Sequence, residues 1–457
     1  MHTLITRWFQ TSSLRGVLLA FLLGASATAS GQVAGVVEFA RGVGSAQMPG
    51  QTPRTLGQGL PLNEGDRLTI SENASAIIRL NDGTRMSLRP NSEILIEQFK
   101  FKPASPDNKM VTQLLRGGFK AVTGEISKSS SDAAQVRTAN ATIKIHGTDF
   151  DARICAQDCK AESSLVAERA LPNTIAASAK LIAAQGQIEA LDFSGKKRTL
   201  VNGGSVYPGD TVTTAATAKG VLVFRDESRV TLGASTSFKV ESFVYDQKNP
   251  SEGSFLLSLA RGSLRALTGV IGKSNTRNVG FKTPTATVGI RGTGLDLDCI
   301  AINDGANDSC SFYTWAGVIE VLPNGQTTPQ ILGVGQGLFV SRTEVRPLNV
   351  PTLEFMQRPD TLTVDMKQLF TLGNVSPDEQ GLFVYVRDGH IEIITLDQIL
   401  HLGLGETGFA GSDGRVGRPD DTPLFIQFDR VPMPNQANPM LFTVLAEVSK
   451  STGNLCR

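Results

Sequence analysis

The chain has no surplus of positive charge, few histidines and few large aromatic side chains. Lys and Arg together number 44 against 43 Asp and Glu, for a formal net charge of +1. Because no basic excess is present to neutralise phosphates, a nucleic-acid partner is not expected. Only 2 Trp and 4 Tyr are available for stacking on sugars. The 457 residues suffice for roughly three domains, and 46 Gly with 40% hydrophobic residues are typical of a turn-rich globular protein.

The short sequence signatures of common enzyme classes are also missing. Neither G-x-S-x-G nor H-E-x-x-H occurs, and no Cys/His pair suggests a nucleophile. The segment GVIGKS (269–274) resembles a phosphate-binding loop, but Leu267 stands where that motif needs its first Gly. We therefore expect no bound nucleotide and no other cofactor.

The chain has four histidines, which leave little imidazole for metal sites or general base catalysis. We interpret His146, His390 and His401 as structural or exposed side chains rather than as catalytic or metal-binding groups. Paired carboxylates such as Asp420 and Asp421 leave a glycosidase-type hydrolase open as an alternative, because such sites need no local motif. The expectation is a protein without enzymatic activity.

Long apolar runs are absent beyond the N-terminus. Residues 1–15 contain two Arg and no acidic residue, and residues 16–29 form a short apolar run that ends in small residues. Ala27 and Ala29 fit the rule for signal-peptide cleavage, which predicts a mature chain that starts near Ser30. An uncleaved anchor is the alternative. We expect export, with the periplasm as the favoured location and the outer surface or the medium as alternatives, and no stable membrane span after cleavage.

Five cysteines are present, and an oxidising compartment favours their pairing. Cys155 and Cys159 lie close together in the sequence, and Cys299 and Cys310 flank an acidic loop at the matching place later in the chain. We predict two local disulfides, with thiolate metal binding as the alternative. Cys456 is left over, either free or paired between chains.

The strongest pattern is a long internal duplication. Two copies of one unit, at about 33–160 and 182–310, share the order, the spacing and the type of their residues. The three aligned pairs of segments are 65–88 with 209–232, 114–129 with 259–274, and 136–155 with 281–299.

Within each copy the apolar residues alternate in short runs that turn residues separate. This period of two predicts strands, and the fold class is therefore all-β. The segment 160–181 is the best helical candidate, but Pro172 interrupts it and it is interpreted as a linker. A smaller repeat follows, in which 312–321 with 332–340 resembles 384–393 with 402–410.

Several motifs of the second copy occur in a fixed order. Gly209 and Asp210 begin a strand, a D-x-x-R step covers 226–229, LARGSLRALTG comes next, and TPTATVGIRGTGLDL follows at 283–297. This ordered set resembles the FecR domain family. The first copy keeps the frame but reads TANATIKIHGT at 138–148, and it is therefore a divergent member. The motif residues are Gly209, Asp210, Thr283, Pro284, Arg291, Gly292 and Thr293 in the second copy, and His146, Gly147 and Thr148 in the first.

The resemblance implies an extracytoplasmic all-β domain with a twisted, β-helix-like or solenoid-like build. In the best-known members this domain lies in the periplasm, receives a signal from an outer-membrane transporter and passes it to a cytoplasmic sigma-factor regulator. This sequence shows neither an N-terminal cytoplasmic region nor an internal transmembrane helix. The resemblance therefore implies a binding or scaffolding role rather than direct sigma-factor control.

Two motifs allow more than one interpretation. Arg291, Gly292 and Thr293 form either a recognition corner for a carboxylate or a strand bend, and the bend is favoured because the first copy keeps the Gly and the Thr but not the Arg. The acidic stretches 303–309 and 411–421 offer oxygens that calcium uses, but neither has EF-hand spacing. We interpret both stretches as solvated turns and predict no metal site.

Taken together, these patterns predict an exported, noncatalytic protein that acts as a protein-interaction or signal-sensing scaffold of the cell envelope. An envelope protein is the expected partner, and a cell-wall glycan is the alternative. The predicted organisation is a signal peptide at 1–29, FecR-like domains at 30–160 and 182–346, a linker at 161–181, and a smaller C-terminal β region at 347–457.

Overall fold

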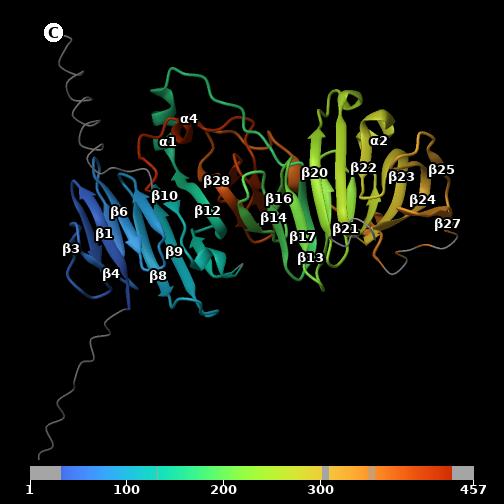
Figure 1. Ribbon diagram of the computed structural model, residues 1–457. Coiled ribbons are helices and arrows are strands. Elements are labelled where there is room, and N and C mark those ends of the chain that lie inside the picture. Colours follow the sequence, from blue (N-terminus) through green and yellow to red (C-terminus); the bar gives the residue numbers. More distant parts are fainter. Residues whose placement is uncertain are drawn as a thin grey trace, which may run out of the picture. The chain divides into compact units, whose positions relative to one another are not determined.

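The computed structural model describes residues 32–434, except 131, 301–307, 349–350, 352 and 354–355. The predicted signal peptide and Cys456 lie outside these residues, and so does the segment LFTVLAEV at 441–448, for which the sequence predicts a closing strand. The described residues form two large β-sheets with a few short helices (Figure 1), which confirms the all-β prediction. None of the helices in the described ranges has both the length and the hydropathy needed to span a lipid bilayer.

The first sheet contains 16 strands. Twelve come from the first copy: β1 (Val33–Arg41), β2 (Gly44–Gln47), β3 (Arg54–Thr55), β4 (Pro61–Asn63), β5 (Arg67–Ile70), β6 (Ser75–Leu80), β7 (Arg85–Leu88), β8 (Glu93–Lys100), β9 (Lys109–Arg116), β10 (Gly118–Val122), β11 (Ala134–Arg137) and β12 (Thr142–Cys155). The other four come from the C-terminal region: β28 (Gly381–Ile394), β29 (Ile399–Leu402), β30 (Thr407–Ala410) and β31 (Val416–Gly417).

The second sheet contains 15 strands, all from the second copy and the residues directly after it. They are β13 (Ala179–Gln185), β14 (Ile188–Leu191), β15 (Lys197–Thr199), β16 (Ser205–Val206), β17 (Thr211–Thr214), β18 (Lys219–Phe224), β19 (Arg229–Leu232), β20 (Ser237–Val244), β21 (Ser254–Leu267), β22 (Val279–Lys282), β23 (Ala286–Ile300), β24 (Ser309–Pro323), β25 (Gln330–Leu332), β26 (Gly337–Ser341) and β27 (Val345–Leu348).

Short helices connect the strands. They are the α-helices α1 (Gln157–Ser164), α2 (Val270–Ser274), α3 (Met366–Phe370) and α4 (Leu424–Gln427), and the 3-10 helices η1 (Ile126–Lys128), η2 (Pro250–Glu252), η3 (Thr276–Asn278) and η4 (Pro359–Thr361). The predicted linker 161–181 therefore contains the end of α1 and the beginning of β13.

The two sheets share one strand order. In the first, β5, β8, β9, β11, β12 and β28 are successive neighbours, and in the second, β17, β20, β21, β22, β23 and β24 are. Each sheet contains one parallel pair at the matching place, β9 with β11 and β21 with β22, among antiparallel neighbours. The duplication in the sequence is thus a duplication of topology, whereas the β-helix-like description stays a prediction.

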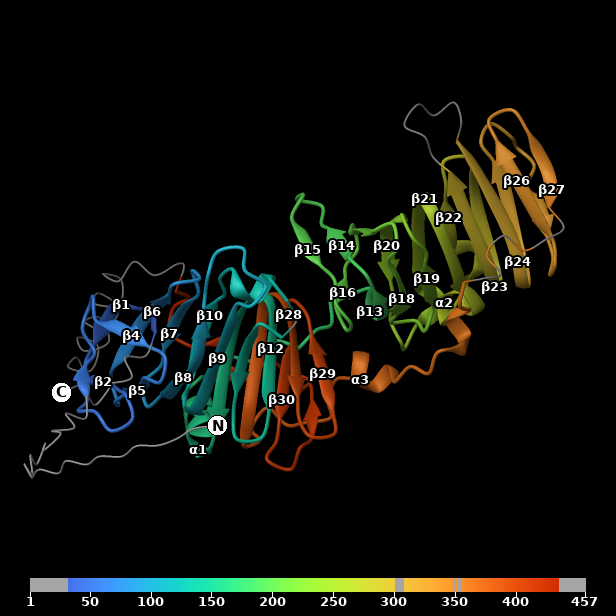
Figure 2. The ribbon, with the colours of Figure 1, turned by 90° about the horizontal axis from the view of Figure 1, so that it is seen from below.

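The last strands of each copy come from different parts of the chain. We call β24–β27 the closing strands of the second copy and β28–β31 the closing strands of the first. Strand β24 is the next strand after β23 in the chain and pairs with it. Strand β28 pairs with β12, although the whole second copy lies between these two strands in the sequence. Figure 2 shows β28 and β29 beside β12. The second copy is therefore inserted between the first copy and its closing strands.

Burial explains why β28 belongs to the first copy. Its alternate residues Leu382, Val384 and Val386 are at most 4% exposed and pack in one apolar cluster with residues of β1 to β12. Fully burying an aliphatic side chain of this size stabilises by about 1.5 to 3 kcal/mol. The sequence predicts a C-terminal β region at 347–457. In the structure, the strands of this region, β28–β31, belong to the first sheet and contribute to the core of the first copy.

Candidate functional site

The R-G-T segment of the second copy forms a bend in β23. Gly292 has a φ of +60°, a conformation that favours glycine, and the pairing of β23 with β24 shifts register here. The Thr293 hydroxyl donates to the Val318 carbonyl at 2.9 Å and accepts from the Arg291 amide at 3.0 Å. These contacts are local, as a strand bend requires.

The H-G-T segment of the first copy forms the same bend in β12. Gly147 also has a φ of +60°, and the Thr148 hydroxyl donates to the His390 carbonyl at 2.9 Å. The first residue of each motif differs but faces an equivalent glutamate: Arg291 forms an ion pair with Glu320, and His146 lies 3.1 Å from Glu392. The Gly and the Thr therefore shape the strand, while the variable residue faces a carboxylate.

The Gly-Asp pair of each copy forms a turn around a buried carboxylate. Gly209 has a φ of +89°, and Asp210 accepts a hydrogen bond from the Tyr207 amide at 2.6 Å and pairs with Arg198. In the first copy Asp66 pairs in the same way with Arg54. A buried carboxylate with both a backbone donor and an Arg is satisfied, so this motif holds the turn.

Thr283 and Pro284 lie in the turn between β22 and β23. The Thr283 hydroxyl donates to the Ala286 carbonyl at 2.8 Å and accepts from the Ala286 amide at 3.0 Å. The side chain of Asn324 donates to the Pro284 carbonyl at 2.7 Å. Hydrogen bonds thus tie the most distinctive stretch of the motif set to the loop that follows β24.

A polar groove of about 410 Å³ opens beside this turn. Pro284 and Thr285 line one side, and the hairpin that joins β26 to β27 lines the other with Arg342, Thr343 and Glu344. Among the described pairings β27 pairs only with β26, so it forms an edge of the second sheet. An exposed edge strand beside a polar groove is a surface that an extended peptide can contact. This groove is the candidate binding site of the second copy.

Both predicted disulfides are present. Cys155 and Cys159 are bonded with their Cα atoms 5.5 Å apart, and Cys299 and Cys310 with theirs 4.1 Å apart. The second bond joins two residues that lie opposite each other on β23 and β24. The disulfide prediction is thus confirmed: the first bond joins the end of β12 to α1, and the second joins β23 to β24.

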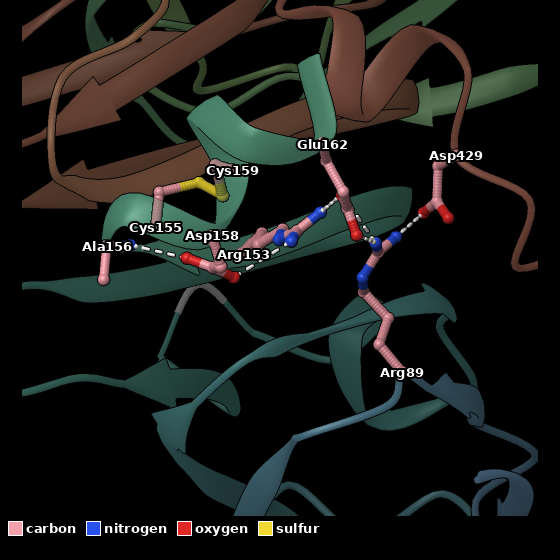
Figure 3. The surroundings of a disulfide bond; sticks show 8 residues. All are labelled: Arg89, Arg153, Cys155, Ala156, Asp158, Cys159, Glu162 and Asp429. Atoms are coloured by element: carbon pink, nitrogen blue, oxygen red, sulfur yellow. Dashed lines mark hydrogen bonds and ion pairs between the residues drawn. A yellow bond between two sulfur atoms is a disulfide. The ribbon is translucent and has the colours of Figure 1, made fainter. Parts of the chain in front are cut away.

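Ion pairs surround the first disulfide (Figure 3). Arg153 pairs with Asp158 and Glu162 of α1, and Arg89 pairs with Glu162 and Asp429. The Arg153 pKa is raised because these carboxylates outweigh the effect of burial, which alone lowers it. The helix that the disulfide pins is therefore also held by charge.

Two segments that resemble ligand loops have other roles. In the GVIGKS segment, the Gly269 amide donates to the Ser228 hydroxyl at 2.8 Å and the Val270 amide donates to the Asp226 carbonyl at 2.7 Å, so these amides are not free to bind phosphate. In the 411–421 stretch, Asp413 pairs with Arg415. Most of the 303–309 stretch lies outside the described residues.

The sequence interpretation missed a cluster that forms where β12, β28 and β29 meet. His146, His390 and His401 all lie there, together with Glu392. Burial lowers the His390 pKa well below its usual range, and burial also lowers that of His401 to about 4. Each histidine was interpreted alone because the pairing of β12 with β28 cannot be seen in the sequence.

Comparison with known proteins identifies the class. The FecR protein family model matches residues 66–168 and 210–314, and each region begins within one of the two copies and ends a few residues beyond it. The chain therefore contains two FecR-like domains, as the sequence predicted. No curated protein sequence matches this chain.

Two crystal structures of a proposed anti-sigma factor from Parabacteroides distasonis ATCC 8503 show a partial likeness. Each is 16% identical in sequence, with a TM-score of 0.24, and the match covers 30% of this chain. The chain spans 59% of the length of that protein.

Proposed function

We propose that this chain is an exported, noncatalytic FecR-domain protein that binds an envelope protein and serves as a signal-sensing or scaffolding module. The observation that carries this proposal is the groove beside Thr283 and Pro284, because it joins the most distinctive FecR stretch to the exposed edge strand β27. Backbone groups at a sheet edge bind an extended partner strand, and neighbouring side chains then select its sequence.

The cysteines support the exported location. All four cysteines of the described residues are in disulfides, and structural disulfides persist mainly in oxidising compartments. The predicted signal peptide accounts for how the chain reaches such a compartment. N-terminal sequencing of the protein from fractionated cells should give Ser30 as the first residue. A protein that keeps residues 1–29 and occurs only in the cytoplasm would contradict export.

Site-specific crosslinking in intact cells tests the binding surface. A photo-crosslinking residue at Thr343, in the β26–β27 hairpin, should capture an envelope protein. The matched control is Asp413, an exposed residue in the corresponding β30–β31 hairpin of the first copy. Equal capture at both positions, or capture of cell-wall glycan instead of protein, would contradict the groove as the protein-binding site.

A further inference from the structure

The three histidines of the described residues lie on one face of the first sheet. His146 on β12 is directly opposite His390 on β28, and His401 on β29 is directly opposite Glu392. His390 and Glu392 are two residues apart on one strand, so their side chains point to the same face. The strand register therefore brings three imidazoles and a carboxylate together.

The distances suit a small cation. Glu392 Oε1 lies 3.1 Å from His146 Nε2 and 4.0 Å from His390 Nε2. His146, His390 and Glu392 each offer one possible ligand atom, and these three atoms all lie within 4.8 Å of one another. A tetrahedral Zn²⁺ with bonds of about 2.0 Å holds its ligand atoms about 3.3 Å apart. Small side-chain movements would therefore bring the three groups to bonding distance.

Several buried ring nitrogens of this cluster have no side-chain hydrogen-bond partner within reach. Only 9% of the His390 side chain is exposed, and its ring interacts with the Leu402 backbone but has no side-chain partner within hydrogen-bond distance. His401 Nδ1 likewise has no partner. Buried polar atoms in folded proteins are normally hydrogen-bonded. The His390 and His401 rings stack with their centroids 5.5 Å apart. Buried imidazole nitrogens without a full set of hydrogen bonds, beside a carboxylate, are a feature of a ligand site.

The second copy serves as an internal comparison. At the equivalent strand positions of the second copy, Arg291 stands in place of His146, Val318 in place of His390 and Ile331 in place of His401. Glu320 is the equivalent of Glu392. Arg291 and Glu320 form an ion pair there. The same strands therefore pack without any histidine, so the fold itself does not require the imidazoles of the first copy.

Two cations near the cluster are already engaged. Lys180 and Arg418 both donate to the His401 carbonyl, and both pair with Glu406, at 3.0 Å and 2.8 Å. Their charge is thus partly balanced by a carboxylate that is not itself part of the cluster. Neither cation pairs with Glu392 in the described contacts, so that carboxylate stays available to an ion.

We propose that His146, His390 and Glu392 bind one divalent first-row transition metal ion, with Zn²⁺ as the ion that fits best. Two imidazoles and a carboxylate are among the ligands that Zn²⁺ accepts, and they leave a fourth position for water. The ion would join β12 to β28 and so fasten the closing strands to the first copy.

Zn²⁺ titration of the full chain tests this proposal. The protein carries no affinity tag, and Cys456→Ser is present in every sample so that no unpaired thiol competes. Competition with a chromophoric chelator should show one Zn²⁺ per chain. Co²⁺ in its place should give the visible absorption of a four-coordinate site.

The variants test whether metal binding can be lost while the chain still folds. H146R combined with H390V installs the residues that the second copy already holds in the same frame, and it should fold but lose stoichiometric binding. E392Q should weaken binding by at least about tenfold, since even indirect partners of metal ligands contribute that much. The matched control is E320Q in the second copy, which should bind as the unaltered chain does.

Two results would overturn the proposal. One is a folded chain that shows no saturable Zn²⁺ binding. The other is equal affinity in E392Q and E320Q, because the ion would then lie elsewhere.

Discussion

Lys180 and Glu406 form a fully buried ion pair between β13 of the second copy and the turn that joins β29 to β30 among the closing strands of the first. Their Nζ and Oε1 atoms lie 3.0 Å apart, and the two side chains are 0% and 1% exposed. Burial lowers the Lys180 pKa to about 8. The Glu406 pKa is also lowered, because Lys180 and Arg418 outweigh the effect of burial on that carboxyl. This pair ties the inserted copy to the strands that follow it.

Glu406→Gln should lower the free energy of unfolding by about 3 to 5 kcal/mol, because it leaves two buried cations without their counter-charge. Urea unfolding followed by circular dichroism measures this change. The control is Glu320→Gln, whose partner Arg291 is 64% exposed at the side chain. Removing so exposed a pair should change stability by less than about 1 kcal/mol. Equal effects from the two variants would contradict the structural role of Glu406.

Asp296→Asn should change how stability depends on pH. Burial raises the pKa of Asp296 to about 6, although Arg265 opposes the shift. Between about pH 4 and pH 6 the folded chain therefore holds a proton that the unfolded chain has released, so this group lowers the free energy of unfolding as pH rises. Two pKa units correspond to about 3 kcal/mol at most.

The measurement for Asp296 is a difference between two proteins. The stability of the unaltered chain minus that of Asp296→Asn should fall as pH rises from 4 to 7, since the Asn side chain does not titrate. A difference that stays constant, or that grows with pH, would show that the pKa of Asp296 is not raised.

Ile393→Ala should destabilise the first copy. Ile393 is 0% exposed on β28 and lies opposite Ile143 of β12, and such a truncation costs about 2 to 5 kcal/mol. In a chain that begins at Ser30, Trp315 on β24 is the only Trp, so its fluorescence reports on the second copy. The unfolding midpoint by circular dichroism should fall while the Trp315 midpoint changes less. Val321→Ala, at the matching position in the second copy, should have the reverse pattern.

Removal of each disulfide should lower the free energy of unfolding, by an amount that increases with the length of the loop that the disulfide closes. Replacing Cys299 and Cys310 by Ser should cost about 3 kcal/mol, and replacing Cys155 and Cys159 about 2 kcal/mol, because the shorter loop restricts the unfolded chain less. Urea midpoints with and without a reductant measure both changes. A reductant should not change the urea midpoint of a variant that lacks all four of these cysteines. In the unaltered chain, mass spectrometry should find that none of the four is a free thiol.

The duplication could be predicted from the sequence because equivalent residues keep their type and spacing. Asp66 and Asp210 each hold a turn after a Gly with positive φ, and Gly147 and Gly292 share a φ of +60°. Local geometry of this kind selects residue types directly, so it leaves a pattern in the chain. The short-range disulfides were predictable for the same reason.

The pairing of β12 with β28 could not be predicted in this way. It depends on contacts between residues such as His146 and His390 that are far apart in the sequence, and alternation within a strand does not name its neighbour. The resemblance of 384–393 to 312–321 was the available signal, since the latter segment is the strand that pairs with β23. The histidine cluster was missed because it exists only once that pairing is made.

The insertion of the second copy sets an order on biosynthesis. About 225 residues separate the end of β12 at Cys155 from the beginning of β28 at Gly381. At roughly 5 to 20 residues per second, a ribosome needs on the order of ten seconds or more to deliver them. Whether the chain folds during synthesis or after export, β12 keeps one flank unpaired until β28 has been delivered. A chaperone that shields this flank would protect the chain during synthesis.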